Sequence, residues 1–370
     1  MRVGILKEIK VEENRVAMTP AGVEQMRLHG HEVLVESNAG AAVGFADETY
    51  QAAGARIAPA AADVYQAAEM VLHVKEPLPT EFELIRRDQI LFAYLHLAAD
   101  QPLTRGLIQA GSVNIAYETI QKADGTLPLL TPMSEVAGRM AVQQAAKYLE
   151  MAHGGRGVLL GGVPGVAPAT VVIIGGGVVG THAAKMACGL GARVYLLEKS
   201  LARLRQLADI MPANCFLLHS NPENLRHWIR RAHVVIGAVL IPGNKAPHLV
   251  SREMLKTMKR GAVLVDVAID QGGCFETSRP TTHADPIYVE EGVIHYTVAN
   301  MPGTLARTAT HALTNATLPY ALEIADKGWR RACHENEEIR KGANVVQGKV
   351  THPGVAAAFG MDLTPMASLL

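Results

Sequence analysis

A glycine-rich turn between two apolar runs places the strongest constraint on how this chain can fold. The run Val171–Ile174 leads directly into the sequence GGGVVG at 175–180, and a second apolar run ends at the carboxylate of Glu198. This order predicts a strand, a tight turn, a helix and a second strand that carries an acid at its end. In such a unit the glycines let the backbone approach a pyrophosphate, and the acid hydrogen-bonds ribose hydroxyls. The helix start offers unpaired N–H groups to the phosphates. A glycine loop used only for packing would explain the glycines but not Glu198, so the pattern predicts a bound dinucleotide.

The length and charge of the chain narrow its class. At 370 residues it exceeds what one hydrophobic core usually holds, so two domains are expected. Lys plus Arg and Asp plus Glu both number 35, so no net field attracts nucleic acid or a membrane, and we expect neither as a partner. The stretch 157–184 lacks charged residues, but its eight glycines and two prolines indicate loop, strand and turn rather than a membrane span. The four cysteines show no metal or redox spacing, which is typical of reduced thiols in the cytoplasm.

Two regions of alternating strand and helix patterns indicate an α/β fold with two domains. In the first region, apolar runs predict a parallel sheet with strands at 3–6, 32–36, 70–74, 90–95 and 113–116. In the second, strands are predicted near 171–174, 193–197, 215–219, 233–239, 262–267 and 293–298. Beyond residue 304 the pattern is helical, at 305–327 and 330–341, with no strand of comparable strength. We therefore expect a Rossmann-type NAD-binding domain, 129–304, inserted into a discontinuous α/β substrate domain made of 1–128 and 305–370. Ser134 is expected to cap a helix that continues to about 152.

Three residues of the first region lie where strands are predicted to end. Arg15 follows the first strand, Lys75 ends the run at 70–74, and His96 ends the run at 90–95. The carboxyl ends of parallel strands are where open α/β sheets bind ligands, so these side chains are candidates for holding a small anion and exchanging a proton with it. Each has a simpler alternative. Arg15 has two acidic neighbours and would suit a surface ion pair, Lys75 would suit a solvated cap before a proline, and a histidine at a strand end is often structural.

Several segments together resemble the alanine dehydrogenase family. They are KEP at 75–77, YLHLA at 94–98, TPMSEVAGR at 131–139, GAVLIPG at 237–243, DVAIDQGG at 266–273 and ANMPG at 299–303. The similarity extends over essentially the whole chain, from 3–8 to 352–355. It implies reversible oxidative deamination of L-alanine to pyruvate and ammonium with NAD, in a cytoplasmic homohexamer. It also implies that Arg15 and Lys75 bind the substrate, that His96 donates and accepts the proton, and that Asp270 is the second catalytic residue.

The nucleotide contacts follow from the glycine motif and from this resemblance. The residues expected to contact NAD are Ser134, Gly175, Gly177, Val178, Val179, Gly180, Glu198, Arg203, Ser220, Val239, Leu240, Val267, Ala268, Ile269, Asp270, Arg279, Val298, Ala299, Asn300 and Met301. The carboxylate of Glu198 should repel a 2′-phosphate, which favours NAD over NADP, although Lys199 and Arg203 are close by. No metal is expected, because Lys327 stands where some relatives carry a metal-binding histidine.

Three alternatives to an alanine enzyme remain open at this stage. The NAD-binding subunit of a proton-translocating transhydrogenase shares the two-domain fold but would need a membrane partner. A non-catalytic nucleotide sensor would leave His96 and Lys75 unexplained. An amino-acid dehydrogenase for a larger substrate would differ only in the size of its pocket.

Overall fold

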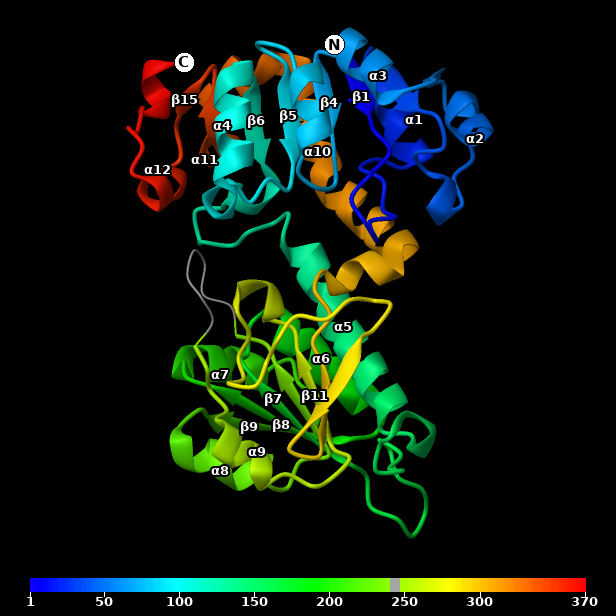
Figure 1. Ribbon diagram of the computed structural model, residues 1–370, viewed down its shortest axis with the longest axis vertical. Helices are drawn as coiled ribbons and strands as arrows, with labels where there is room; N and C mark the ends of the chain where they lie inside the picture. The colour runs from blue at the N-terminus through cyan, green and yellow to red at the C-terminus, as the bar shows by residue number, and fades with distance from the viewer. Residues whose placement is uncertain (240–246) are drawn as a thin grey trace. The chain divides into compact units, whose positions relative to one another are not determined.

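The computed structural model describes residues 1–239 and 247–370. The described chain forms two compact units, which we call the split unit (Met1–Met133 with Gly303–Leu370) and the inserted unit (Ser134–Pro302). Both chain ends belong to the split unit (Figure 1). Each unit is built on its own mostly parallel sheet, so the predicted fold class, a Rossmann-type domain inserted into a discontinuous α/β domain, is confirmed.

The split unit contains an eight-stranded sheet in the order β15-β14-β6-β5-β4-β1-β2-β3. Its strands are β1 (Arg2–Ile5), β2 (Glu32–Glu36), β3 (Arg56–Ala58), β4 (Met70–Leu72), β5 (Ile90–Ala93), β6 (Val113–Ala116), β14 (Ala343–Val346) and β15 (Lys349–Val350). The first six strands pair in parallel with one another, as continuous apolar runs predict. The pairs β14–β6 and β14–β15 are antiparallel.

The expectation that no strand comparable to the others follows residue 304 is wrong. The four residues of β14 are all buried and pair with β6, and the Asn114 side chain donates to the Val345 carbonyl at 3.0 Å. The run is short and contains Asn344, so its own sequence is a weak strand signal. It becomes a strand because β6 supplies its partner.

Helices cover both faces of this sheet. They are α1 (Pro20–Leu28), α2 (Asp47–Ala52), α3 (Ala61–Ala67), α4 (Gln101–Ala110), α10 (Ala306–Glu335), α11 (Glu337–Gly342) and α12 (Pro353–Phe359). In Figure 1, α4 lies in front of the strands and α10 lies behind them. The core on one face joins Val64 and Tyr65 of α3 and Leu107 of α4 to the strand residues Val71 and Leu91. The helix α10 leaves helical geometry at Gly328, where φ is 72°, close to the break expected between two helices.

The inserted unit contains a seven-stranded sheet in the order β12-β13-β11-β10-β7-β8-β9. Its strands are β7 (Thr170–Ile174), β8 (Arg193–Glu198), β9 (Cys215–His219), β10 (Val234–Gly237), β11 (Val263–Asp266), β12 (Ile287–Glu290) and β13 (Val293–Tyr296). Only β12 runs antiparallel to its neighbour among these paired strands. The six parallel strands follow the order 3-2-1-4-5-6, which is the order of dinucleotide-binding sheets.

The first six strands of the split unit have this same order. In both sheets the second and third strands lie on one side of the first strand, and the later strands lie on its other side. The strand order therefore reverses between β1 and β4 in the split unit and between β7 and β10 in the inserted unit. Ligands of open α/β sheets bind beyond the carboxyl ends of the strands at such a switch point. The topology therefore marks one candidate ligand site in each unit.

The helices of the inserted unit are α5 (Thr131–Tyr148, of which 134–148 belong to this unit), α6 (Val178–Gly189), α7 (Leu201–Ala208), α8 (Pro222–Ile229) and α9 (Arg252–Lys256). The prediction that Ser134 caps α5 is wrong. The helix already begins at Thr131, so Ser134 lies inside its first turn. Pro132 is compatible with this start because a proline in the first helical turn loses no helical hydrogen bond. No described helix is both long enough and apolar enough to cross a bilayer.

Candidate functional site

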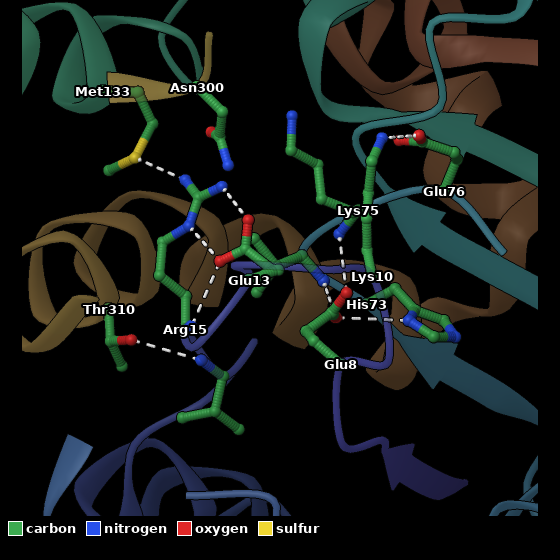
Figure 2. A network of polar contacts seen from close by, with 12 residues as sticks. Glu8, Lys10, Glu13, Arg15, His73, Lys75, Glu76, Met133, Asn300 and Thr310 are labelled. Carbon is green, nitrogen blue, oxygen red and sulfur yellow. Dashed lines mark hydrogen bonds and ion pairs between the residues drawn. The ribbon is translucent and has the colours of Figure 1, made fainter. Parts of the chain in front are cut away.

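Arg15 lies in the loop that follows β1 and is held by an internal ion pair. Its side chain is 2% exposed, and Glu13 accepts from Nε at 2.7 Å and from Nη2 at 2.5 Å (Figure 2). Burial opposes the charge of Arg15, but the hydrogen bonds and negative charge of Glu13 outweigh it, so the pKa of Arg15 is raised. A surface ion pair is therefore excluded. The guanidinium stays charged in a buried position.

Lys75 follows β4, the strand next to β1 in the sheet. Its side chain is partly buried, and its backbone N–H donates to Glu8 Oε2 at 3.3 Å. Burial, and then the positive charge of Arg15, lower the pKa of Lys75. A solvated cap would show neither effect, so that alternative fails. The structure thus brings Arg15 and Lys75 close enough for their charges to interact at the switch point of the split unit.

His96 follows β5 in an unusual backbone conformation. Its φ of 48° and ψ of 36° are left-handed, which is costly for a residue other than glycine. Glu118 holds this geometry by accepting the His96 N–H at 2.6 Å. The imidazole stacks on Tyr94 with 6.1 Å between ring centroids, yet about half of it stays exposed. Its Nδ1 lies 4.0 Å from Glu118 Oε1, so the ring is oriented by Glu118 and Tyr94 while about half of it faces solvent.

The glycine turn of the inserted unit has the steric requirements that the motif predicts. Gly175 has φ of 106°, and a Cβ there would lie 2.6 Å from the Ala238 carbonyl oxygen. A Cβ on Gly180 would lie 1.9 Å from the carbonyl oxygen of Gly175, closer than atoms can approach. Gly177 precedes the first residue of α6. The turn thus directs a helix start past the carboxyl end of β7, at the switch point of this unit.

Glu198 and Arg203 both bind the backbone of that turn. The Glu198 carboxylate accepts from the N–H of Gly176 at 2.8 Å and from the N–H of Ser200 at 2.8 Å. Arg203 Nε donates to the Gly176 carbonyl at 2.8 Å, and its Nη2 donates to Thr181 Oγ1 at 3.0 Å. The two side chains thus hold both the N–H and the carbonyl of Gly176. This bracing role could not be inferred from the spacing of the motif.

Most other expected nucleotide residues lie beyond the carboxyl ends of neighbouring strands. Ser220 follows β9, Val239 follows β10, the stretch 267–270 follows β11 and the stretch 298–301 follows β13. Asp270 belongs to a short 3-10 turn and accepts from the N–H of Asn300 at 3.3 Å. Arg279 stacks on the ring of Tyr288, 4.1 Å from its centroid. Leu240 lies outside the described residues.

A buried carboxylate that sequence reasoning missed supports this loop. Asp266, at the end of β11, is fully buried and accepts from the N–H groups of Ala268 at 3.1 Å and Cys274 at 2.8 Å, and from the Ser278 hydroxyl. Burial raises the pKa of Asp266 to about 6. It anchors the segment that carries Asp270. In the sequence it stands at the end of an apolar run and begins the segment at 266–273, but neither feature shows that its carboxylate is buried.

Lys327 forms ion pairs with two carboxylates of the split unit. Its Nζ lies 2.8 Å from Glu323 Oε1 and 3.0 Å from Glu335 Oε2. Among the described residues, no group of three or more His, Cys, Asp or Glu side chains is arranged to hold a metal ion.

Comparison with known proteins assigns the chain to a family. The family model "Alanine dehydrogenase/PNT, N-terminal domain" matches residues 4–137, and the corresponding C-terminal domain matches residues 141–353. The chain belongs to the alanine dehydrogenase/PNT family. The family resemblance inferred from sequence segments is thereby confirmed.

The chain is more similar to some members of this family than to others. An alanine dehydrogenase of Methanococcus maripaludis is 55% identical over the full length of both chains. A solved structure named L-alanine dehydrogenase is 49% identical, with a TM-score of 0.95 over 97% of this chain and 99% of that one. A transhydrogenase structure from Sinorhizobium meliloti is 26% identical, with a TM-score of 0.82 over 95% of this chain and 99% of that one. The chain is thus much more similar to these alanine dehydrogenases than to this transhydrogenase.

Proposed function

We propose that this protein catalyses the reversible, NAD-dependent oxidative deamination of L-alanine to pyruvate and ammonium. The observation that carries the proposal is the 55% identity to an alanine dehydrogenase along the entire chain. The geometry of the split unit supports it independently. A buried guanidinium, a lysine of lowered pKa and an exposed histidine gather at the carboxyl edge of one sheet, and together they suit a small amino acid.

The side chains of the split unit divide the chemistry between them. Arg15 binds the substrate carboxylate and so orients the alanine Cα, whose hydrogen leaves as hydride. NAD, when bound, supplies the hydride acceptor. Water then adds to the iminium carbon and gives one proton to His96, which passes it to the amino group. As ammonia leaves, the hydroxyl proton of the adduct moves to His96 and the carbonyl forms. Lys75 stabilises the oxygen that develops negative charge as the carbonyl forms. Asp270 of the inserted unit is proposed as the second catalytic residue.

NAD rather than NADP is the proposed cofactor. The Glu198 carboxylate lies at the glycine turn, where it would repel the 2′-phosphate of NADP. Arg203, the nearby cation that would favour NADP, already donates to Gly176 and Thr181. This proposal includes the nucleotide-contact residues that were named from the sequence. It also includes a nucleotide-binding domain of 129–304 and a substrate domain of 1–128 and 305–370.

We further propose a homohexamer in the cytoplasm. Large apolar side chains are exposed along one stretch of the inserted unit, at Met151, Leu159, Val163 and Val166, which supports self-association. The four cysteines are free thiols, which supports a reducing compartment.

L-Alanine and NAD at alkaline pH should give NADH, measured by its absorbance. Replacing NAD by NADP should lower kcat/KM by about 100-fold or more, because the carboxylate of Glu198 disfavours a phosphate. D-alanine is the matched control, since its side chain and hydrogen are exchanged at Cα and it should give no NADH. Hydride transfer between nucleotides only after addition of membranes, with no NADH from alanine, would instead support the transhydrogenase alternative.

Replacing Lys75 by arginine should remove an alkaline limb from the pH profile. The pKa of Lys75 is lowered, so wild-type kcat/KM should fall with rising pH earlier than an ordinary lysine would cause. Arginine stays charged at every assay pH, so this limb should disappear, while the altered geometry lowers kcat by about 10- to 100-fold. The measurement is kcat/KM against pH for both proteins. An alkaline limb at the same pH in Lys75→Arg would assign the ionisation to another group.

A further inference from the structure

A buried polar chain lies directly behind Lys75 at the switch point of the split unit. Glu8 follows β1 and His73 follows β4, and these two strands pair with Ile5 opposite Leu72. Glu8 is 9% exposed and His73 is 2% exposed. Figure 2 shows the Glu8 carboxylate pointing to the His73 ring and to the backbone that leads to Lys75. Neither residue has a role in the chemistry proposed above.

Every hydrogen-bonding group of this buried polar network has a partner when His73 carries both ring protons. His73 Nδ1 lies 3.2 Å from Glu8 Oε1, and its Nε2 lies 3.0 Å from the hydroxyl of Tyr65. The Tyr65 hydroxyl donates in turn to Glu81 Oε1 at 3.3 Å. If Nε2 carried no proton, the tyrosine would donate to it and could not donate to Glu81. An imidazolium therefore gives every group in the chain a partner.

The charge of His73 agrees with this assignment. Burial alone would lower its pKa, but Tyr65, Glu8 and Glu81 together raise the pKa of His73 well above its usual value. The ring is thus a buried cation between two carboxylates. Its consequence is that the Glu8 carboxylate is fixed in orientation inside the domain.

Glu8 uses that fixed carboxylate to hold the backbone of the substrate-binding turn. Oε1 accepts from the N–H of Val74 at 2.6 Å, and Oε2 accepts from the N–H of Lys75 at 3.3 Å. One carboxylate thus binds two successive amides, one of which belongs to Lys75. A shift of this turn would move the Lys75 ammonium relative to Arg15.

We propose that Glu8 is a positioning residue for Lys75, and that His73, Tyr65 and Glu81 keep it in place. This inference rests on the proposed function, in which Lys75 contacts the substrate. The competing explanation is a stability role for a buried ion pair, with no specific effect on substrate. The two explanations differ in whether the effect of altering Glu8 depends on Lys75.

Glu8→Gln separates the two because it alters one oxygen of the carboxylate. With the amide oxygen at the Oε1 position, the side chain still accepts from Val74 and from His73. The amide NH₂ then faces the N–H of Lys75, so two donors oppose each other there. Glu36→Gln is the matched control. Glu36 is partly buried and, like Glu8, accepts a backbone N–H, that of Lys7 at 2.9 Å, which a glutamine still satisfies.

The test measures pyruvate binding to the enzyme–NADH complex by NADH fluorescence, without ammonium so that no turnover occurs. Glu8→Gln should raise the Kd for pyruvate by about 10-fold while the Kd for NADH stays within about twofold. Lys75→Ala should weaken pyruvate binding at least as much, and the double variant should bind no more weakly than Lys75→Ala alone. Glu36→Gln should match the wild type.

Two results would overturn the inference. One is unchanged pyruvate binding in Glu8→Gln, and the other is a double variant whose loss equals the sum of the two single losses. If Glu8→Gln does not fold, the same comparison of single and double variants is made with His73→Gln in place of Glu8→Gln. This change removes the charge that holds Glu8 and leaves Lys75 untouched. A wild-type protein that forms no NADH from alanine refutes the proposed function instead. If the wild type is active but the losses in pyruvate binding add up in the double variant, only the role of Glu8 is refuted.

Discussion

Replacing His96 by alanine should lower kcat for alanine deamination by about 1,000-fold, because a positioned acid–base group contributes roughly 10²- to 10⁴-fold. The imidazole is the proposed proton carrier for both water addition and ammonia departure. Its removal should leave the Kd for NADH unchanged, since the inserted unit carries the glycine turn, Glu198 and Arg203. Steady-state NADH formation and NADH fluorescence titration measure the two quantities.

His334→Ala is the control for this substitution. His334 is an exposed histidine of the split unit near the end of α10, so its removal tests the loss of an imidazole without loss of the site. Its kcat should equal that of the wild type. If His96→Ala kept more than about one tenth of wild-type kcat, His96 would not be the proton carrier.

Replacing Gly180 by alanine should abolish measurable NADH binding, with a rise in Kd of about 100-fold or more, because the new Cβ has no space. That Cβ would lie 1.9 Å from the carbonyl oxygen of Gly175, so the turn and the start of α6 must separate. The N–H groups that face the pyrophosphate would then be misplaced. Isothermal titration with NADH measures the loss, and thermal unfolding shows whether the inserted unit still folds.

Gly189→Ala in the same helix is the matched control. Gly189 is exposed and ends α6, and a Cβ added there would meet no atom within 4 Å, so alanine should fit without displacement. Because alanine favours helix over glycine, this change should stabilise the protein by up to about 1 kcal/mol and leave NADH binding intact. Equal NADH affinities for the two alanine variants would show that the turn tolerates a side chain and does not approach the nucleotide.

The features that could be predicted from sequence are those that a short segment determines by itself. The steric need for glycine at 175 and 180 arises within one turn and its neighbouring strand, so the motif revealed it. Strands such as β7 and β10 are continuous apolar runs because both faces of the sheet are covered. The candidate residues Arg15, Lys75 and His96 were found because they lie next to such runs.

The features that were missed depend on partners far away in the chain. The strand β14 forms on β6, to which it pairs across 231 residues of sequence. Glu8 and His73 are separated by 65 residues, and nothing near either one in the sequence indicates that they pair. Whether Arg15 was a surface ion pair could likewise not be settled from its acidic neighbours, because its burial comes from the surrounding fold.

The position of β14 also sets the order in which the protein can be completed during synthesis. Asn114 of β6 and Val345 of β14 are 231 residues apart, and the whole inserted unit is translated between them. At about 5–20 residues per second, the ribosome takes roughly 10 to 45 seconds to cover that distance. During this interval β6 is an open sheet edge, which is prone to pair with other chains. The nascent chain can therefore finish the inserted unit before the unit that holds Arg15 and Lys75.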